Sequence, residues 1–511
     1  MLTSSIQHDV VVTPRTTRSW IWALTTVLVV IPCVWQKHIA GADYPSHLYN
    51  AWLAQTIAAT PTEGLKVVPM WTNVLGDLVL LWASQSLGSA VAEMLVPALA
   101  VLLFFWGAFF WIKNAAGHEP WAFTPLLAMA AYGVVFHLGF LNHYLSTGIC
   151  LWVLALMWRP TILRFGLALV LAALATLAHP LPVLWTAVLL CYVNLARAIP
   201  RQFREWLFIA ALAAMIGLRQ AIVSQFPSRP VWHVEDVSGI FLGMLGTEQV
   251  WVFGQKYFAV AIVLSAMAGA LLWQFIDAAQ RRHVSLWEDE LLDLWILHAA
   301  AFVLIPAALQ LPQYQHVLAF LPQRISLFGI LSLCLLMASR TPAKLAWALF
   351  LPLALVYFSF LYIDSAAYNR VELQVDSLIE KLPPGQRVVG PIYDDGARFP
   401  ALLHVVDRAC IGRCFSFADY EPATGQFRIR AEGPNGMVAW RMSDVQAMEG
   451  GEYVVKAADE PFYSLRACEA VGGLCLQQVK AGEKTSSTTL AITPKWWQSE
   501  VSRAINAAET K

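Results

Sequence analysis

The stretch AVAEMLVPALAVLLFFWGAFFWI, at residues 90–112, decides the class of this protein. It carries one charged side chain, Glu93, in an otherwise apolar and aromatic sequence. An apolar helix needs about 20 residues to cross the roughly 30 Å of hydrocarbon in a bilayer. The stretch is long enough, so we expect a transmembrane helix here.

Ten further stretches share this character. They lie at residues 20–36, 121–137, 140–158, 163–178, 181–196, 205–225, 255–277, 291–309, 319–338 and 344–362. Of the 511 residues, 58% are hydrophobic and only 13% are charged, about half the charge of a soluble domain. Basic and acidic residues number 34 each, so no net field would recruit nucleic acid. The composition predicts an all-α polytopic membrane bundle. It excludes a disordered, fibrous, nucleic-acid-binding or ordinary cytosolic protein.

A shorter apolar stretch, residues 74–87, decides the topology. Lysine and arginine concentrate in the cytoplasmic loops of membrane proteins. Twelve basic residues of this chain lie on the same side of the membrane only if residues 74–87 do not cross it. The twelve are Arg15, Arg18, Lys113, Arg159, Arg164, Arg197, Arg201, Arg204, Arg281, Arg282, Arg340 and Lys344. We therefore expect about eleven crossings of a plasma (inner) membrane and a cytoplasmic N-terminus. Two interfacial helices, at residues 46–58 and 74–87, lie in the first outer loop.

The N-terminus imitates a signal peptide, because Arg15 and Arg18 precede an apolar run that ends at Ala40-Gly41-Ala42. The run is rich in tryptophan and the chain continues as a membrane protein. An uncleaved first span is therefore the simpler interpretation.

The chain changes character after residue 363. Residues 1–363 form the expected membrane domain, and residues 364–511 regain charge and contain no stretch long enough to span. We expect a helix at residues 365–381, followed by a small extracytoplasmic α/β domain. Its expected strands lie at residues 387–392, 426–430, 452–456 and 474–479. The tail at residues 494–508 predicts an amphipathic helix, which either anchors at the interface or packs on the domain.

The eight cysteines divide into two groups. Four lie in the expected spans as buried apolar residues, namely Cys33, Cys150, Cys191 and Cys334. The other four, Cys410, Cys414, Cys468 and Cys475, lie in the outer domain. An even number in an oxidising compartment predicts two disulfides, with proximity favouring the local pairs. A zinc site is the alternative, although the spacing misses the usual C-x2-C pattern.

Five successive outer loops supply polar side chains, which indicates one shared outer cavity. Candidate substrate-binding residues among them are His47, Asn142, His143, Arg219, His316 and Arg324. Asp43 is the sharpest candidate, because it follows the first span and precedes Pro45. It either caps the next helix or acts as a general base at the lipid–water boundary.

Arg324 and Arg219 lie at the outer ends of apolar spans, where an arginine needs an anionic partner. A lipid-linked phosphate is one such partner, because guanidinium binds phosphate with two hydrogen bonds. The alternatives are an ion pair with Glu235, Asp236 or Asp43, or a side chain that extends to the headgroups.

This layout resembles the GT-C superfamily of integral-membrane glycosyltransferases. The resemblance lies in one span, an outer loop opening with Asp43, two interfacial helices, a long bundle and an outer C-terminal domain. It implies inverting transfer of a sugar from a polyprenyl-phosphate donor, with Asp43 as the base. Tyr44 stands where many members carry a second acidic residue, and the 137–145 turn carries His143 instead of an acidic pair. A divalent metal cofactor is therefore left open.

The sequence thus predicts a membrane glycosyltransferase with the bilayer, a polyprenyl-phosphate sugar and a glycan, lipid or protein acceptor as partners. Nucleic acid is not among them. Two alternatives remain at this point: a non-catalytic scaffold or polymer-assembly component of the same fold, and a secondary transporter, for which no internal repeat is found.

Overall fold

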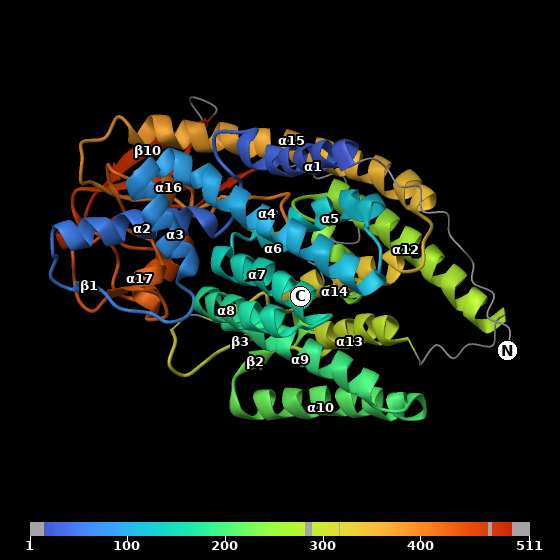
Figure 1. Ribbon diagram of the computed structural model, residues 1–511. Helices are drawn as coiled ribbons and strands as arrows, with labels where there is room; N and C mark the ends of the chain where they lie inside the picture. Colours follow the sequence, from blue (N-terminus) through green and yellow to red (C-terminus); the bar gives the residue numbers. More distant parts are fainter. Residues whose placement is uncertain (1–14, 282–288, 316, 469–472, 493–511) are drawn as a thin grey trace, which may run out of the picture.

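A computed structural model describes residues 15–281, 289–315, 317–468 and 473–492 (Figure 1). The molecule is mostly helical, and a smaller region that contains most of the strands lies at one end, orange to red at the left of Figure 1. The tail helix expected at residues 494–508 falls outside the described residues.

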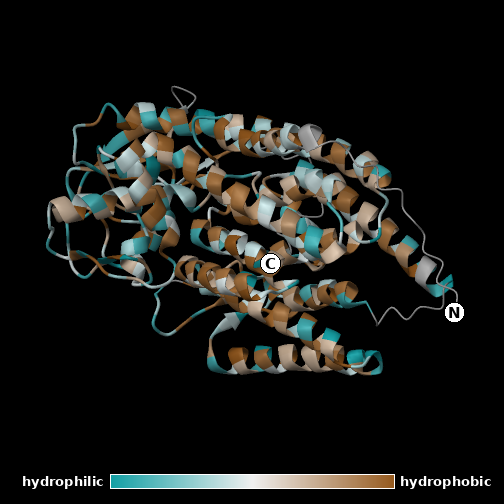
Figure 2. Ribbon diagram, viewed as in Figure 1, coloured by the Kyte–Doolittle hydropathy of each residue, from teal (hydrophilic) through white to brown (hydrophobic). Residues whose placement is uncertain are grey.

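Six described helices are long and apolar enough to cross a membrane. They are α4 (Ser89–Ala116), α9 (Pro180–Ala198), α10 (Arg204–Gln225), α12 (Gln255–Arg281), α14 (Leu321–Ala338) and α15 (Ala343–Ile379). Shorter apolar helices include α1 (Arg15–Val34), α7 (Leu141–Met157) and α8 (Ile162–Ala178), and α13 covers Glu290–Leu304. Hydrophobic residues dominate these helices in Figure 2. The structure therefore supports a membrane protein, while the count of eleven crossings stays a prediction.

Burial differs sharply among these helices. Every residue of α14 is buried, which makes it the central helix of the bundle. By contrast, α10 buries only Phe208 and lies at the lower edge of the molecule in Figure 1. A helix that is apolar yet unpacked on most of its surface suits a lipid environment.

Both helices predicted in the first outer loop are confirmed. Helix α2 covers Tyr44–Ala59 and α3 covers Leu75–Leu87. Pro45 sits in the first turn of α2, where its fixed φ and missing N–H cost nothing. The strand β1 (Leu65–Val67) lies between them and pairs antiparallel with β8 (Ile429–Ala431), so this loop is joined directly to the C-terminal region.

Two expected elements have different boundaries. The helix expected at residues 121–137 is split into α5 (Thr124–Ala131) and α6 (Val134–His137). At the break, a side chain on Gly133 would collide with Gln249, whose Oε1 accepts a hydrogen bond from the Val135 N–H. The helices expected at 344–362 and 365–381 are instead one continuous helix, α15, because no proline or glycine interrupts the chain between them.

The main sheet of the C-terminal region has four strands in the order β10-β9-β5-β7. Its strands are β5 (Arg387–Val389), β7 (Phe415–Ser416), β9 (Phe462–Cys468) and β10 (Gly473–Val479). β9 and β10 form an antiparallel hairpin, whereas β5 runs parallel to β7 and β9. The expected strand at residues 452–456 is reduced to a single bridge between Val454 and Lys484. Short helices complete the region, namely α16 (Val405–Cys410), α17 (Glu421–Thr424) and α18 (Met442–Glu449).

Smaller strand pairs connect other parts of the chain. The parallel pair comprises β6 (Ile392–Asp394) and β11 (Thr488–Leu490). A three-stranded sheet comprises β2 (Ser228–Arg229), β3 (Ala308–Leu309) and β4 (Leu318–Ala319). The expected span at residues 291–309 therefore ends as α13 at Leu304, before β3 begins.

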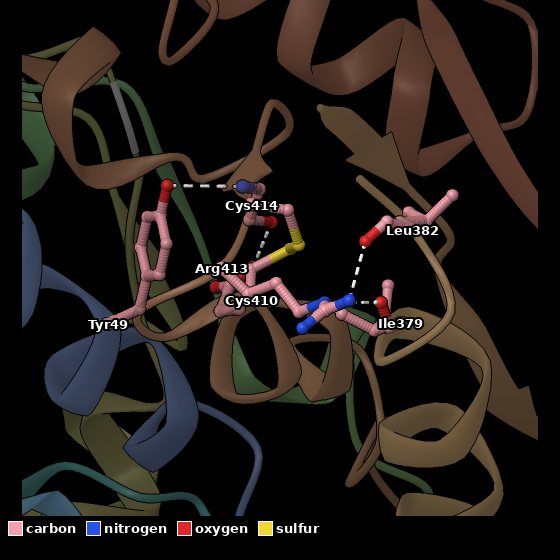
Figure 3. The surroundings of a disulfide bond; sticks show 8 residues. Tyr49, Ile379, Leu382, Cys410, Arg413 and Cys414 are labelled. Carbon is pink, nitrogen blue, oxygen red and sulfur yellow. Dashed lines mark hydrogen bonds between the residues drawn. A yellow bond between two sulfur atoms is a disulfide. The ribbon is translucent and has the colours of Figure 1, made fainter. Parts of the chain in front are cut away.

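The predicted local disulfides are present, as Cys410–Cys414 and Cys468–Cys475, and leave no zinc ligands among these four. Figure 3 shows the first pair at the end of α16. Arg413, inside this short loop, donates hydrogen bonds to the carbonyls of Ile379 (3.1 Å) and Leu382 (2.7 Å) at the end of α15. Three of the remaining cysteines are buried as expected, but Cys191 is exposed on α9.

Candidate functional site

A cavity of about 260 Å³ lies where the helical bundle meets the C-terminal region. Its polar lining comprises Asp43, His47, Asn73, Asn142, His143, His179, Arg324, His404, Tyr420, Gln426 and Glu449. Five candidates predicted from three separate loops therefore lie around one cavity, namely Asp43, His47, Asn142, His143 and Arg324.

The position of Asp43 depends on a close approach between two backbone segments. The Ala42 N–H donates to the carbonyl of His137 (2.9 Å), and the Asp43 N–H donates to that of Leu138 (3.1 Å). Gly139 follows with φ of +76°, and a Cβ there would lie 2.3 Å from the backbone nitrogen of Tyr44. Only glycine fits this position.

The side chain of Asp43 accepts a hydrogen bond from the hydroxyl of Tyr420 at 2.7 Å, and its other oxygen lies 3.5 Å from Nε2 of His47. Asp43 occupies the N-cap position of α2, but its side chain makes no capping hydrogen bond there, so the prediction that this side chain caps the helix is wrong. Burial opposes ionisation, but His47, His404 and Tyr420 outweigh it and hold the pKa of Asp43 below its usual value. Asp43 is therefore a carboxylate at neutral pH.

His47 lies among three carboxyl groups. Its Nδ1 is 3.0 Å from Asp77 of α3 and 3.3 Å from Glu421 of α17, in addition to the Asp43 contact. Burial disfavours the charged ring, but these carboxylates raise the pKa of His47 well above its usual value. Asn142 fixes the start of α3, because it accepts from the Gly76 N–H (2.6 Å) and donates to Asp77 (3.3 Å).

Arg324 is a buried cation that has no ion pair in the part of the chain that the structure describes. Its guanidinium lies 4.1 Å from the ring centre of Phe140, and its Nε has no hydrogen-bond partner. Of the three expected partners, Glu235 contacts Arg398 (3.5 Å), and the side chain of Asp236 accepts a hydrogen bond from the Gly239 N–H (2.6 Å). The third, Asp43, lines the same cavity as Arg324 without forming an ion pair with it. The cavity at Arg324 is therefore prepared for an anion.

Two histidines adjoin Arg324 in the cavity lining. The rings of His143 and His179 lie edge to face with centres 5.1 Å apart. Both ring nitrogens of His143 are buried without a hydrogen-bond partner in the described structure. An imidazole left this way can donate or accept a hydrogen bond from a bound ligand.

One other candidate, Arg219, is not brought to this cavity. Arg219 lies over the ring of Trp232 at 5.4 Å and lines a separate cavity of about 90 Å³ with Ser228 and Pro230. His316 is not among the described residues.

Backbone strain concentrates at the cavity. Among the described residues, the two non-glycine positions with positive φ are Asn73 (55°) and Phe320 (57°), and both line it. Such conformations cost of order 1–3 kcal/mol each and cluster at functional sites.

The sequence prediction missed His404, Tyr420, Glu421 and Glu449. These residues lie in the C-terminal region, where charge and polarity are ordinary, so composition gave no signal for them. These residues join the site only through contacts with residues far away in the sequence, as in the hydrogen bond from Tyr420 to Asp43.

The carboxyl groups around His47 do not fit a divalent metal. Asp43, Asp77 and Glu421 converge on the His47 ring, which supplies the positive charge that a metal would bring. Within the described ranges, no three histidine, cysteine or acidic side chains are arranged to hold a metal ion.

Comparison with protein-family models, with curated protein sequences and with solved structures finds no significant match to this chain.

Proposed function

We propose that this protein is a membrane glycosyltransferase that moves a sugar from a polyprenyl-phosphate donor to an acceptor hydroxyl. One observation carries the proposal: the carboxylate of Asp43 lines the same cavity as the guanidinium of Arg324, which has no ion pair among the described residues. A base and an anion-binding group around one cavity are the two functions that such a transfer requires.

The reaction follows from these two groups. Asp43 accepts the proton of the acceptor hydroxyl, and the acceptor oxygen attacks the anomeric carbon. The bond from that carbon to the phosphate oxygen breaks, so polyprenyl phosphate leaves with one more negative charge. Arg324 stabilises this charge as it develops. Attack on the side away from the phosphate inverts the anomeric centre.

The apolar part of the cavity supports a lipid-linked donor. Phe140, Val317, Leu318 and Phe320 line it beside Arg324. Val317 and Phe320 remain 39% and 38% exposed, so an apolar surface continues outward from the cavity. A phosphate held at Arg324 could thus keep its chain on this surface.

The proposal includes a plasma-membrane topology with eleven crossings and the region after residue 363 outside. Twelve one-sided basic residues and two disulfides support it. Arg201→Cys in a protein otherwise free of exposed thiols should resist an impermeant reagent added to intact cells. Labelling there would overturn the topology.

The direct test uses the full chain in nanodiscs with a polyprenyl-phosphate sugar and a glycan acceptor mixture. Asp43→Asn keeps the size of the side chain but loses proton acceptance, so transfer should fall about 10²–10⁴-fold. Melting temperature and donor binding should stay near those of the wild type. Asp444→Asn, at a half-buried site away from the cavity where the carboxylate pairs with the exposed Lys456, is the control. Normal turnover in Asp43→Asn would remove Asp43 from the mechanism and favour a non-catalytic role.

A further inference from the structure

The C-terminal region lines its own part of the cavity, and His404 is the central side chain there. His404 is 8% exposed and precedes α16. Its Nδ1 lies 3.0 Å from Asp407, whereas its Nε2 has no hydrogen-bond partner among the described residues. Because His404 lines the cavity, this free nitrogen is available to a ligand.

Asp407 fixes the orientation of this ring. Its second oxygen accepts a 2.5 Å hydrogen bond from the hydroxyl of Ser416 on β7. A carboxylate held in this way keeps a proton on Nδ1 and fixes the rotation of the ring. Burial opposes protonation, but Asp407 and, more weakly, Asp43 raise the pKa of His404 to about 9. At neutral pH, Nε2 is therefore a hydrogen-bond donor.

Aromatic and acidic side chains surround this donor. The ring centre of Tyr420 lies 5.2 Å from that of His404, and Phe427 lies edge to face with Tyr420 at 5.6 Å. Glu449, at the end of α18, lines the same part of the cavity. A sugar ring presents C–H groups on its faces and hydroxyls at its edge. Aromatic faces, a donor and a carboxylate acceptor match these groups.

We propose that His404, Glu449 and Phe427 form the acceptor subsite and that it binds a sugar ring. This rests on the proposed glycosyl transfer, because it places the acceptor next to Asp43, which Tyr420 connects to this subsite by its 2.7 Å hydrogen bond. The acceptor is then a glycan or a glycolipid headgroup, and an acceptor without sugar would lack these contacts.

Saccharide binding tests the subsite without requiring transfer. Saturation-transfer NMR would be recorded on the full chain in nanodiscs with glucose, galactose, mannose, N-acetylglucosamine and their disaccharides. At least one should bind the wild type, and His404→Gln and Glu449→Gln should each weaken that binding about tenfold or more, as loss of a charged hydrogen bond does. Glu449→Gln removes a different contact of the same subsite. Its effect on saccharide binding therefore still tests the proposal if His404→Gln does not fold.

The matched control is His118→Gln, an exposed histidine whose Nε2 lies 3.1 Å from the Ala338 carbonyl, and it should bind like the wild type. Failure of every saccharide to bind, or unchanged binding in both subsite variants, would overturn the inference. Saccharide binding that follows the subsite variants, with no transfer from any lipid-linked donor, would count against the proposed function alone.

Discussion

The hydroxyl of Tyr420 donates a 2.7 Å hydrogen bond to the carboxylate of Asp43, across 377 positions of sequence. Asp43 belongs to the loop between α1 and α2, and Tyr420 belongs to the C-terminal region. The environment of the proposed base is therefore completed by the second part of the chain.

Replacement of Arg324 tests the anion site. Arg324→Met should lower transfer about 10²–10³-fold, the loss seen when a preorganised charge stabiliser is removed. The transfer rate of Arg324→Lys should lie between those of the wild type and Arg324→Met, because lysine keeps the charge but lacks the planar geometry that makes two hydrogen bonds to phosphate. Arg219→Met, in its separate cavity, is the control. Equal activity of Arg324→Met and Arg219→Met would show that Arg324 does not bind the donor phosphate.

Gly139→Ala should displace the Asp43 loop. The new Cβ would meet the Tyr44 nitrogen at 2.3 Å, in addition to the strain of a positive φ. Gly412→Ala has a similar φ of +75° and open space around it, so it isolates the strain alone, about 1–2 kcal/mol. Transfer and thermal stability should both fall further in Gly139→Ala. Similar values for the two variants would mean that the close approach is unimportant.

Arg408 should be essential for stability. It is buried and contacts Glu93 of α4 (3.2 Å) and Glu372 of α15 (2.9 Å). Arg408→Met leaves Glu372 buried without its cationic partner and leaves Glu93 paired with His38 alone, and loss of a buried partner typically costs about 3–5 kcal/mol. The exposed pair of Lys484 with Glu452 gives a control, because Lys484→Met should change stability by less than about 1 kcal/mol. Thermal unfolding in detergent measures both, and a wild-type melting temperature for Arg408→Met would contradict the prediction.

Stability should decline in alkaline solution through His38. Burial disfavours its charged form, but Asp376 (2.9 Å) and Glu93 (3.0 Å) raise its pKa to about 9. A histidine whose pKa is raised on folding stabilises fully below its unfolded pKa of about 6.5 and loses this contribution as the pH rises through about 9. The melting temperature should therefore drop between pH 6.5 and 10, less so in His38→Gln. Parallel curves for the two proteins would exclude His38 as the cause.

The two disulfides should differ in their effect on function. Each closes a short loop and should contribute about 2–3 kcal/mol to stability. Only Cys410–Cys414 adjoins α16, which directly follows His404 (Figure 3). The double serine variant at this pair should lose both stability and saccharide binding. The double variant at Cys468 and Cys475, on the β9–β10 hairpin, should lose stability alone.

Several site residues of the apolar helical region could be predicted from the sequence, because a charged or polar side chain stands out among apolar neighbours. Asp43, His143 and Arg324 were found on this basis, and the cavity brings them together. The same signal selected Arg219, which lies on the peripheral helix α10, since composition marks a polar residue but not the direction in which its helix packs. His404 and Tyr420 could not be found, because their partners are determined by tertiary contacts across hundreds of residues.

Helix α15 runs without a break for 37 residues, about 55 Å at 1.5 Å per residue. That is nearly twice the hydrocarbon thickness of a bilayer. Its far end holds Arg408 through Glu372 and Arg413 through the Ile379 carbonyl. In the proposed topology, the length of this helix therefore sets the height of the C-terminal region above the lipid. A substrate anchored in the membrane would meet its reaction partner at one fixed depth, whatever the length of its tail.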